Sequence, residues 1–198
     1  MKSPGPDIYK AYRRRFMRAM TASALGSFFP IIGSAHGGVG ILKPPLALPS
    51  GSAVVRSDGV RMPLQSILRG KTTALQLIFT GCSETCPLQG ALFAGVQERL
   101  PAMHAKNIQL LSLSIDPMDD AKALSSWLRR FGARNGWVAA VPTHEDIPAV
   151  NAVLQQGTPA VNNHSSQVYF IDPRGRLVWR SEDLPPVEVV IQILEHLT

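Results

Sequence analysis

The sequence predicts an α/β fold in which a mixed central sheet carries helices on both faces. Thr73–Phe79 is an apolar run typical of a buried strand, and a glycine turn after it leads into a helix-period segment from Pro87 to about His104. The next apolar run, Ile108–Asp116, predicts a second strand parallel to the first, because a helix connects the two. A late hairpin within Gln167–Arg180 adds an antiparallel pair, so we expect a mixed sheet.

The other elements follow from hydrophobic periodicity and turn residues. Ala53–Arg56 and Val60–Met62 flank Ser57-Asp58-Gly59, which predicts an amino-terminal β-hairpin with Gly59 at the position that needs a positive φ. Further along the chain we expect a helical turn at 64–68, a helix from the aspartates 119 and 120 to 131, a strand at 136–141, a helix from the capping residues 143–146 to about 156, a polar loop to 166 and a last helix at 186–197.

Length and charge restrict the functional classes. With 198 residues and 45% hydrophobic residues, the chain can bury one core, which we place at residues 53–198. The net charge of +6 could indicate a nucleic-acid-binding protein. Six basic residues and one aspartate in residues 1–35 account for five of these charges, so the remainder is nearly neutral. We therefore expect no nucleic-acid partner.

Residues 1–35 have the features of an export signal. Arg13-Arg14-Arg15-Phe16-Met17-Arg18 is similar to a twin-arginine signal, which carries folded proteins across the bacterial inner membrane. A mildly apolar stretch follows, and Gly33-Ser34-Ala35 provides the small residues that a signal peptidase accepts. We expect cleavage near Ala35 and a periplasmic protein; the alternative is a retained amino-terminal membrane anchor. Residues 36–52 are rich in Gly and Pro and predict a flexible lead-in.

The only two cysteines, Cys82 and Cys86, follow the first central strand. This point, at the carboxyl end of a strand and the amino end of a helix, is where α/β sheets place reactive groups. Unpaired backbone N–H groups and the helix dipole there favour a thiolate, so we expect a lowered thiol pKa. Four helical residues rise only about 6 Å, and a tight loop before the helix would bring the sulfurs together equally well. A disulfide closing so short a loop constrains the unfolded chain little, which favours a redox-active or metal-binding dithiol over a structural bond.

Three motifs follow one another along the chain: Phe79-Thr80-Gly81-Cys82-x-x-x-Cys86-Pro87, then Ser114-Ile115-Asp116-Pro117, then His164-Ser165 before 168–176. Together they resemble the SCO/SenC family of thioredoxin-like copper proteins linked to cytochrome c oxidase assembly. The resemblance spans residues 53–198 and implies a thioredoxin-like domain. It also implies that Cys82, Cys86 and His164 are copper ligands.

The donor set suits that cargo, because two thiolates favour Cu(I) and one imidazole also tolerates Cu(II). Three donors leave the metal accessible to an acceptor. Two positions depart from the family pattern: Ser83 replaces a proline after the first cysteine, and Asn163 replaces an aspartate before the histidine. Loss of that acidic neighbour changes the basicity or orientation of the imidazole.

Two functions share these residues. The first is a metallochaperone that delivers copper to, or prepares, the copper-bearing subunit of cytochrome c oxidase or another copper acceptor. The second is a thiol–disulfide oxidoreductase that reduces cysteines of a copper-site apoprotein and is itself reduced by a periplasmic thiol reductant. His164 discriminates between them, because a reductase has no need of it. A peroxide-scavenging role is weaker, since no peroxidatic motif is present. We expect a monomer.

Overall fold

An eight-stranded mixed sheet organises the part of the chain that the structure, a computed structural model, describes: residues 40–100, 107–156 and 166–198. The chain divides into two units, residues 1–35 and 36–198, and all described residues belong to the second. The predicted export signal and most of the predicted polar loop, including His164, lie outside the described residues.

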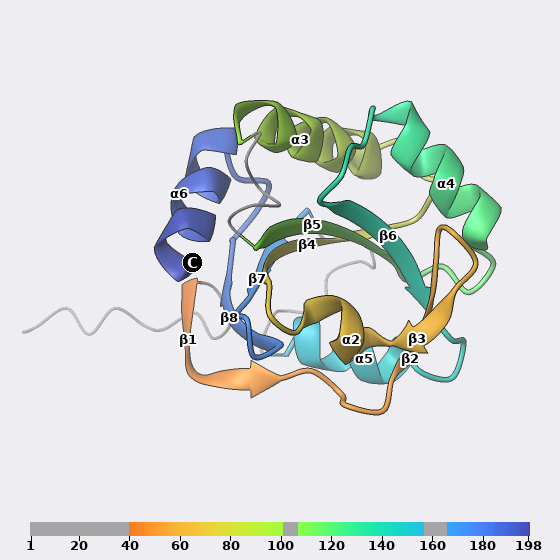
Figure 1. The fold of residues 1–198 in the computed structure, drawn as a ribbon, viewed down its shortest axis with the longest axis horizontal. Coiled ribbons are helices and arrows are strands. Elements are labelled where there is room, and N and C mark those ends of the chain that lie inside the picture. Colours follow the sequence, from red (N-terminus) through yellow and green to blue (C-terminus); the bar gives the residue numbers. More distant parts are fainter. Residues whose placement is uncertain (1–39, 101–106, 157–165) are drawn as a thin grey trace, which may run out of the picture. The chain divides into compact units, whose positions relative to one another are not determined.

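The strands are joined in the order β1-β8-β7-β4-β5-β6-β2-β3 (Figure 1). β4, β5 and β6 are parallel neighbours, whereas β7, β8, β1 and the β2–β3 pair join the sheet antiparallel. The element bounds are β1 Gly40–Ala47, β2 Ala53–Arg56, β3 Arg61–Pro63, α2 Leu64–Leu68, β4 Thr72–Ile78, α3 Thr85–Arg99, β5 Ile108–Ser114, α4 Ala121–Arg130, β6 Trp137–Pro142, α5 Ile147–Leu154, β7 Val168–Ile171, β8 Arg176–Arg180 and α6 Val187–Leu197. The mixed α/β prediction is thereby confirmed.

Strand alternation assigns the helices to the two faces of the sheet. Leu75 and Leu77 of β4 pack in one apolar cluster with α2 and α5. Ala74 and Ile78, on the other face of β4, pack with α3, α4 and α6 in two further clusters. This is the period of two expected for a strand that is covered on both sides. Figure 1 shows α3 and α4 on one side of the sheet and α2 and α5 on the other.

Strand β1 corrects the prediction of a flexible lead-in over residues 36–52 at Gly40–Ala47, whereas residues 36–39 lie outside the described residues. Gly40 and Ile41 pair with Arg180 and Trp179, and the register shifts before pairing resumes at Leu46. Pro44 and Pro45 lie in the interrupted part, where a missing N–H breaks no ladder bond. Locally the segment has the composition of a loop. It is a strand because the exposed edge of β8 offers hydrogen-bond partners, which the local sequence does not reveal.

The ends of the predicted helices also shift, for local reasons. α3 begins at Thr85 and ends at Arg99, before Pro101, so it is shorter at its carboxyl end than predicted. α4 is capped by Asp120, whose carboxylate accepts from Ala123 N–H at 2.8 Å, while Asp119 lies outside the helix. α5 begins only at Ile147, because the Asp146 carboxylate is engaged elsewhere, accepting from the Ala53 N–H and the Thr143 hydroxyl.

Candidate dithiol and metal site

A tight turn connects the end of β4 to the cysteines. The Cys82 N–H donates to the Phe79 carbonyl oxygen at 3.1 Å, which closes a turn through Thr80 and Gly81. β4 and β5 pair without interruption from Thr72↔Ile108 to Ile78↔Ser114, so both strands end level at one edge of the sheet. The turn that carries Cys82 therefore leaves from the carboxyl edge, where the sequence places it.

Of the two possibilities for the cysteines, the structure has the loop that ends at a helix start. Cys82 precedes α3, and Cys86 lies in its first turn. Pro87 follows within that turn, where its missing N–H costs no intrahelical hydrogen bond. Neither cysteine forms a disulfide, and the two side chains are within hydrogen-bonding reach of each other. The dithiol is thus assembled locally by the turn and the helix start.

The two sulfurs have different environments. Cys86 is 2% exposed and packs with Ile78, Leu124 and Trp127, whereas Cys82 is half-buried. Burial raises the pKa of Cys86 to about 12; a backbone hydrogen bond with Phe79 opposes this rise, and contact with Cys82 adds to it. The expected lowering of the thiol pKa is wrong for Cys86, because loss of solvation outweighs the helix-terminus effect.

Asp119, which we predicted to lie in a helix, is a candidate for holding the cysteine turn in place. Its carboxylate accepts hydrogen bonds from Thr80, in the cysteine turn, and from Ser114, at the end of β5. Asp116, at the end of the same strand motif, instead closes its own turn by accepting from the Met118 N–H at 2.9 Å. The sequence signal that could have identified Asp119 is the prediction of two parallel strands, because the turns that follow β4 and β5 must then meet at one edge of the sheet.

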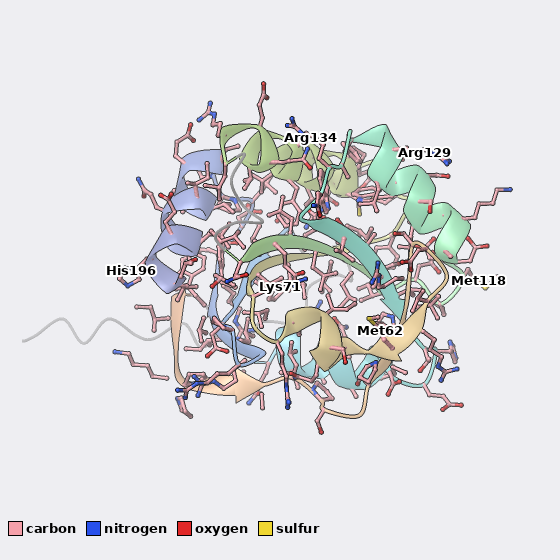
Figure 2. The ribbon with its side chains drawn as sticks, viewed as in Figure 1. Met62, Lys71, Met118, Arg129, Arg134 and His196 are labelled. Atoms are coloured by element: carbon pink, nitrogen blue, oxygen red, sulfur yellow. The ribbon has the colours of Figure 1, made fainter. Side chains whose placement is uncertain are left out.

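The third predicted ligand, His164, lies outside the described residues. Within the described ranges, no three His, Cys, Asp or Glu side chains lie together as a metal-binding group. Met118 is 86% exposed and points outward (Figure 2), so it does not pack in the core. The described part of the site therefore consists of two thiols.

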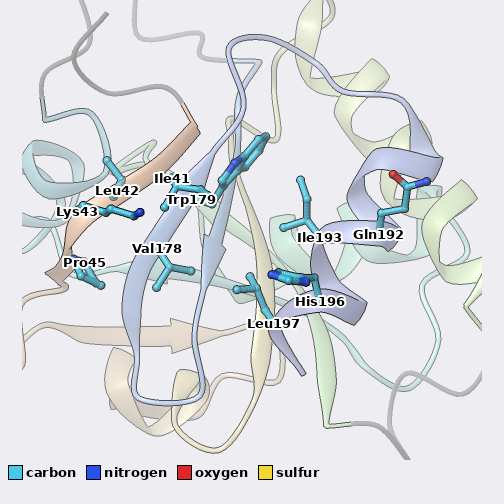
Figure 3. Close-up of a pocket in the computed structure, with 10 residues that line it drawn as sticks. All are labelled: Ile41, Leu42, Lys43, Pro45, Val178, Trp179, Gln192, Ile193, His196 and Leu197. Atoms are coloured by element: carbon cyan, nitrogen blue, oxygen red, sulfur yellow. The ribbon is translucent and has the colours of Figure 1, made fainter. Parts of the chain in front are cut away.

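A separate pocket lies between β1, β8 and α6. It has a volume of about 570 Å³ and is lined mainly by apolar side chains, among them Ile41, Val178, Trp179 and Ile193, with Lys43 and His196 also contributing (Figure 3). Neither cysteine lines it. The pocket consequently has no part in the dithiol site.

None of the described helices has both the length and the apolar character that a membrane crossing requires.

The fold and the adjacent thiols define a thioredoxin-like protein with a dithiol at the carboxyl edge of its sheet. The sequence model of the SCO1/SenC family matches residues 54–198, and the chain belongs to that family. The resemblance noted in the sequence is thereby confirmed. A search of the curated proteins finds no match.

Solved structures share the fold. A SCO1/SenC family lipoprotein from Bacillus anthracis is 25% identical, with a TM-score of 0.62 over 79% of this chain and 98% of that one. Bradyrhizobium japonicum ScoI, solved with copper bound, is 17% identical, with a TM-score of 0.61 over 77% of this chain and 100% of that one. BsSco, described as a member of the Sco family of cytochrome c oxidase assembly proteins, is 22% identical, with a TM-score of 0.60 over 79% and 96%.

Proposed function

We propose that this protein binds one copper ion through Cys82, Cys86 and His164 and passes it to a copper acceptor during cytochrome c oxidase assembly. The observation that carries the proposal is the pair of reduced thiols held side by side, one buried and one half-buried. Two sulfurs placed together are soft donors that fit Cu(I), and an imidazole completes a trigonal set. Membership of the SCO1/SenC family and the copper-bound ScoI structure support this assignment.

The chain's own residues would take different parts in holding copper. Cys86 is fixed by core packing, so its sulfur is the rigid donor, and it must lose its proton when the metal binds. Cys82 lies on a turn and is more accessible, so its sulfur is the donor from which an incoming acceptor ligand displaces copper. Release would then begin at Cys82 and end at Cys86.

Copper titration of the reduced full-length chain tests the proposal. The wild type should bind one equivalent, and Cu(II) should give an intense thiolate-to-metal absorption band. Cys82→Ser and Cys86→Ser should each weaken binding by more than about 100-fold, because each removes a soft ligand. His164→Ala should bleach or shift the band, while the exposed His144, changed to Ala as a control, should leave it unchanged.

The reductase alternative is favoured by the unequal burial of the thiols. Cys82 would attack a target disulfide and release one target thiol; Cys86 would then attack the Cys82 sulfur, releasing the second target thiol and leaving a Cys82–Cys86 disulfide. Two electrons pass to the target, and an external thiol reductant restores the dithiol. If His164→Ala binds copper like the wild type while both Cys→Ser variants lose disulfide reduction, the reductase function replaces the chaperone.

We further propose that residues 1–35 direct export to the periplasm. The support is the arginine cluster followed by an apolar stretch and small residues. Protein purified from the periplasm of an exporting host should begin near His36, and Arg13→Lys/Arg14→Lys should leave the chain in the cytoplasm. A chain recovered with residues 1–35 attached and pelleting with membranes would instead establish the retained anchor.

A further inference from the structure

One carboxylate connects the turn that bears Cys82 to the neighbouring strand. Asp119 Oδ2 accepts from the Thr80 N–H at 3.0 Å and from Ser114 Oγ at 2.6 Å. Asp119 Oδ1 accepts from the Thr80 hydroxyl. Hydrogen bonds to an ionised carboxylate are stronger than those between neutral groups, so three of them fix Thr80 against the end of β5.

The turn held in this way contacts both sulfur-bearing residues. The Phe79 carbonyl accepts the Cys82 N–H, and the Phe79 backbone is hydrogen-bonded to the Cys86 thiol. Thr80 follows Phe79 directly, so a shift of Thr80 moves the point to which both cysteines are attached. The parallel ladder ends with Ile115 N–H donating to the Ile78 carbonyl at 3.1 Å. Beyond that point, Asp119 connects the turn that follows β4 to the end of β5.

We propose that Asp119 is a positioning residue of the dithiol site, one that sets where the Cys82 sulfur lies relative to Cys86. The expected effect on copper binding rests on the proposed function, whereas the expected effect on the redox equilibrium of the Cys82–Cys86 couple does not. Both metal binding and disulfide formation need the two sulfurs at narrow separations. Partners that orient ligands typically change metal affinity 10–100-fold when removed, and we expect about this effect from Asp119→Ala.

Asp120 provides a matched control, because it is the same residue type one position along the chain with a different task. Its carboxylate caps α4 through the Ala123 N–H and, among the described residues, makes no hydrogen bond to the cysteine turn. Asp120→Ala should lower the melting temperature by removing that cap. It should leave the geometry of the dithiol intact.

The experiment compares Asp119→Ala and Asp120→Ala in the full-length chain. The readouts are the Cu(II) absorption band, Cu(I) affinity by chelator competition, and the redox equilibrium of the metal-free Cys82–Cys86 couple. Asp119→Ala should weaken Cu(I) binding 10–100-fold, shift the band and change the redox equilibrium constant by about tenfold, or about 30 mV for two electrons. Asp120→Ala should match the wild type in all three.

Two milder variants keep the proposal testable if Asp119→Ala does not fold. Asp119→Asn retains an acceptor for the Thr80 N–H, and the hydroxyls can accept from its amide, so it should restore part of the wild-type behaviour. Thr80→Val removes only the hydroxyl contact, and the double variant with Asp119→Ala should be no worse than Asp119→Ala alone. Equal site readouts for the Asp119 and Asp120 variants would overturn the inference. A wild type that binds no copper would overturn the proposed function, and the redox arm would still test Asp119.

Discussion

Iodoacetamide is expected to alkylate Cys86 about a thousand-fold more slowly in the folded, metal-free protein than in the same protein denatured at pH 8. The thiolate is the reactive form. A thiol with a pKa of about 12 is ionised to about one part in ten thousand at pH 8, against about one in ten for the ordinary value of 9.0. Burial of Cys86 to 2% exposure adds a steric barrier. Cys82, which is half-buried, should react first.

The raised pKa of Cys86 makes both its alkylation rate and the stability of the fold depend on pH. In the folded protein the alkylation rate of Cys86 should rise about tenfold per pH unit up to about pH 12, whereas in the denatured protein it should level off near pH 9. Because the unfolded state loses this proton first, stability is fully present below about pH 9 and falls as pH rises toward 12. Tandem mass spectrometry of the peptide that carries both cysteines measures each rate. Equal modification of Cys86 in both states would show that the first turn of α3 opens readily.

This asymmetry matters for either function. If the protein reduces a target, Cys82 is the attacking thiol and Cys86 the resolving one, because the target must reach the more accessible sulfur. If the protein carries copper, the metal must displace a proton from the buried Cys86 thiol, so binding strengthens as pH rises. Burial of one sulfur thus directs the order of events at the site.

Arg180→Ala is expected to destabilise the fold by about 3–5 kcal/mol. Arg180 is 1% exposed, and its guanidinium donates to the Leu154 carbonyl at 2.6 Å and to the Gln156 carbonyl. It therefore satisfies carbonyls at the carboxyl end of α5, and burial lowers its pKa. Truncation removes both donors and leaves a cavity, and these two costs add.

Chemical denaturation of three variants separates these costs. Arg180→Met fills much of the volume but leaves the carbonyls without a donor, and Arg180→Lys retains one charged donor. We expect the loss to decrease in the order Ala, Met, Lys. Arg176, at the other end of β8, forms an ion pair with Asp172, and its side chain is 37% exposed. Arg176→Ala should therefore lower the free energy of unfolding by only about 1 kcal/mol or less. If Arg180→Ala costs no more than Arg176→Ala, the buried guanidinium does not hold β8 to α5.

Local sequence determined most of the sheet. The largely apolar runs of β4 and β5, the Ser57-Asp58-Gly59 hairpin and the late hairpin are patterns that extend over only a few residues, and all are confirmed. The pair of cysteines after β4 was visible for the same reason. Helix ends were not determined by local sequence. Asp146 precedes α5, but its carboxylate makes no capping hydrogen bond to that helix because it accepts from the Ala53 N–H.

What the sequence by itself determined about this protein is the parallel pair β4–β5, the antiparallel hairpin β7–β8 and the presence of a dithiol where β4 ends. Tertiary structure alone decided three things: that Gly40–Ala47 is a strand, that Cys86 is buried with a raised pKa, and that Asp119 rather than Asp116 binds the cysteine turn. Each depends on a partner far away in sequence, namely β8, the α4 core and Thr80. Solvation and long-range hydrogen bonds are set by which segments meet, whereas periodicity reports only what a segment does on its own.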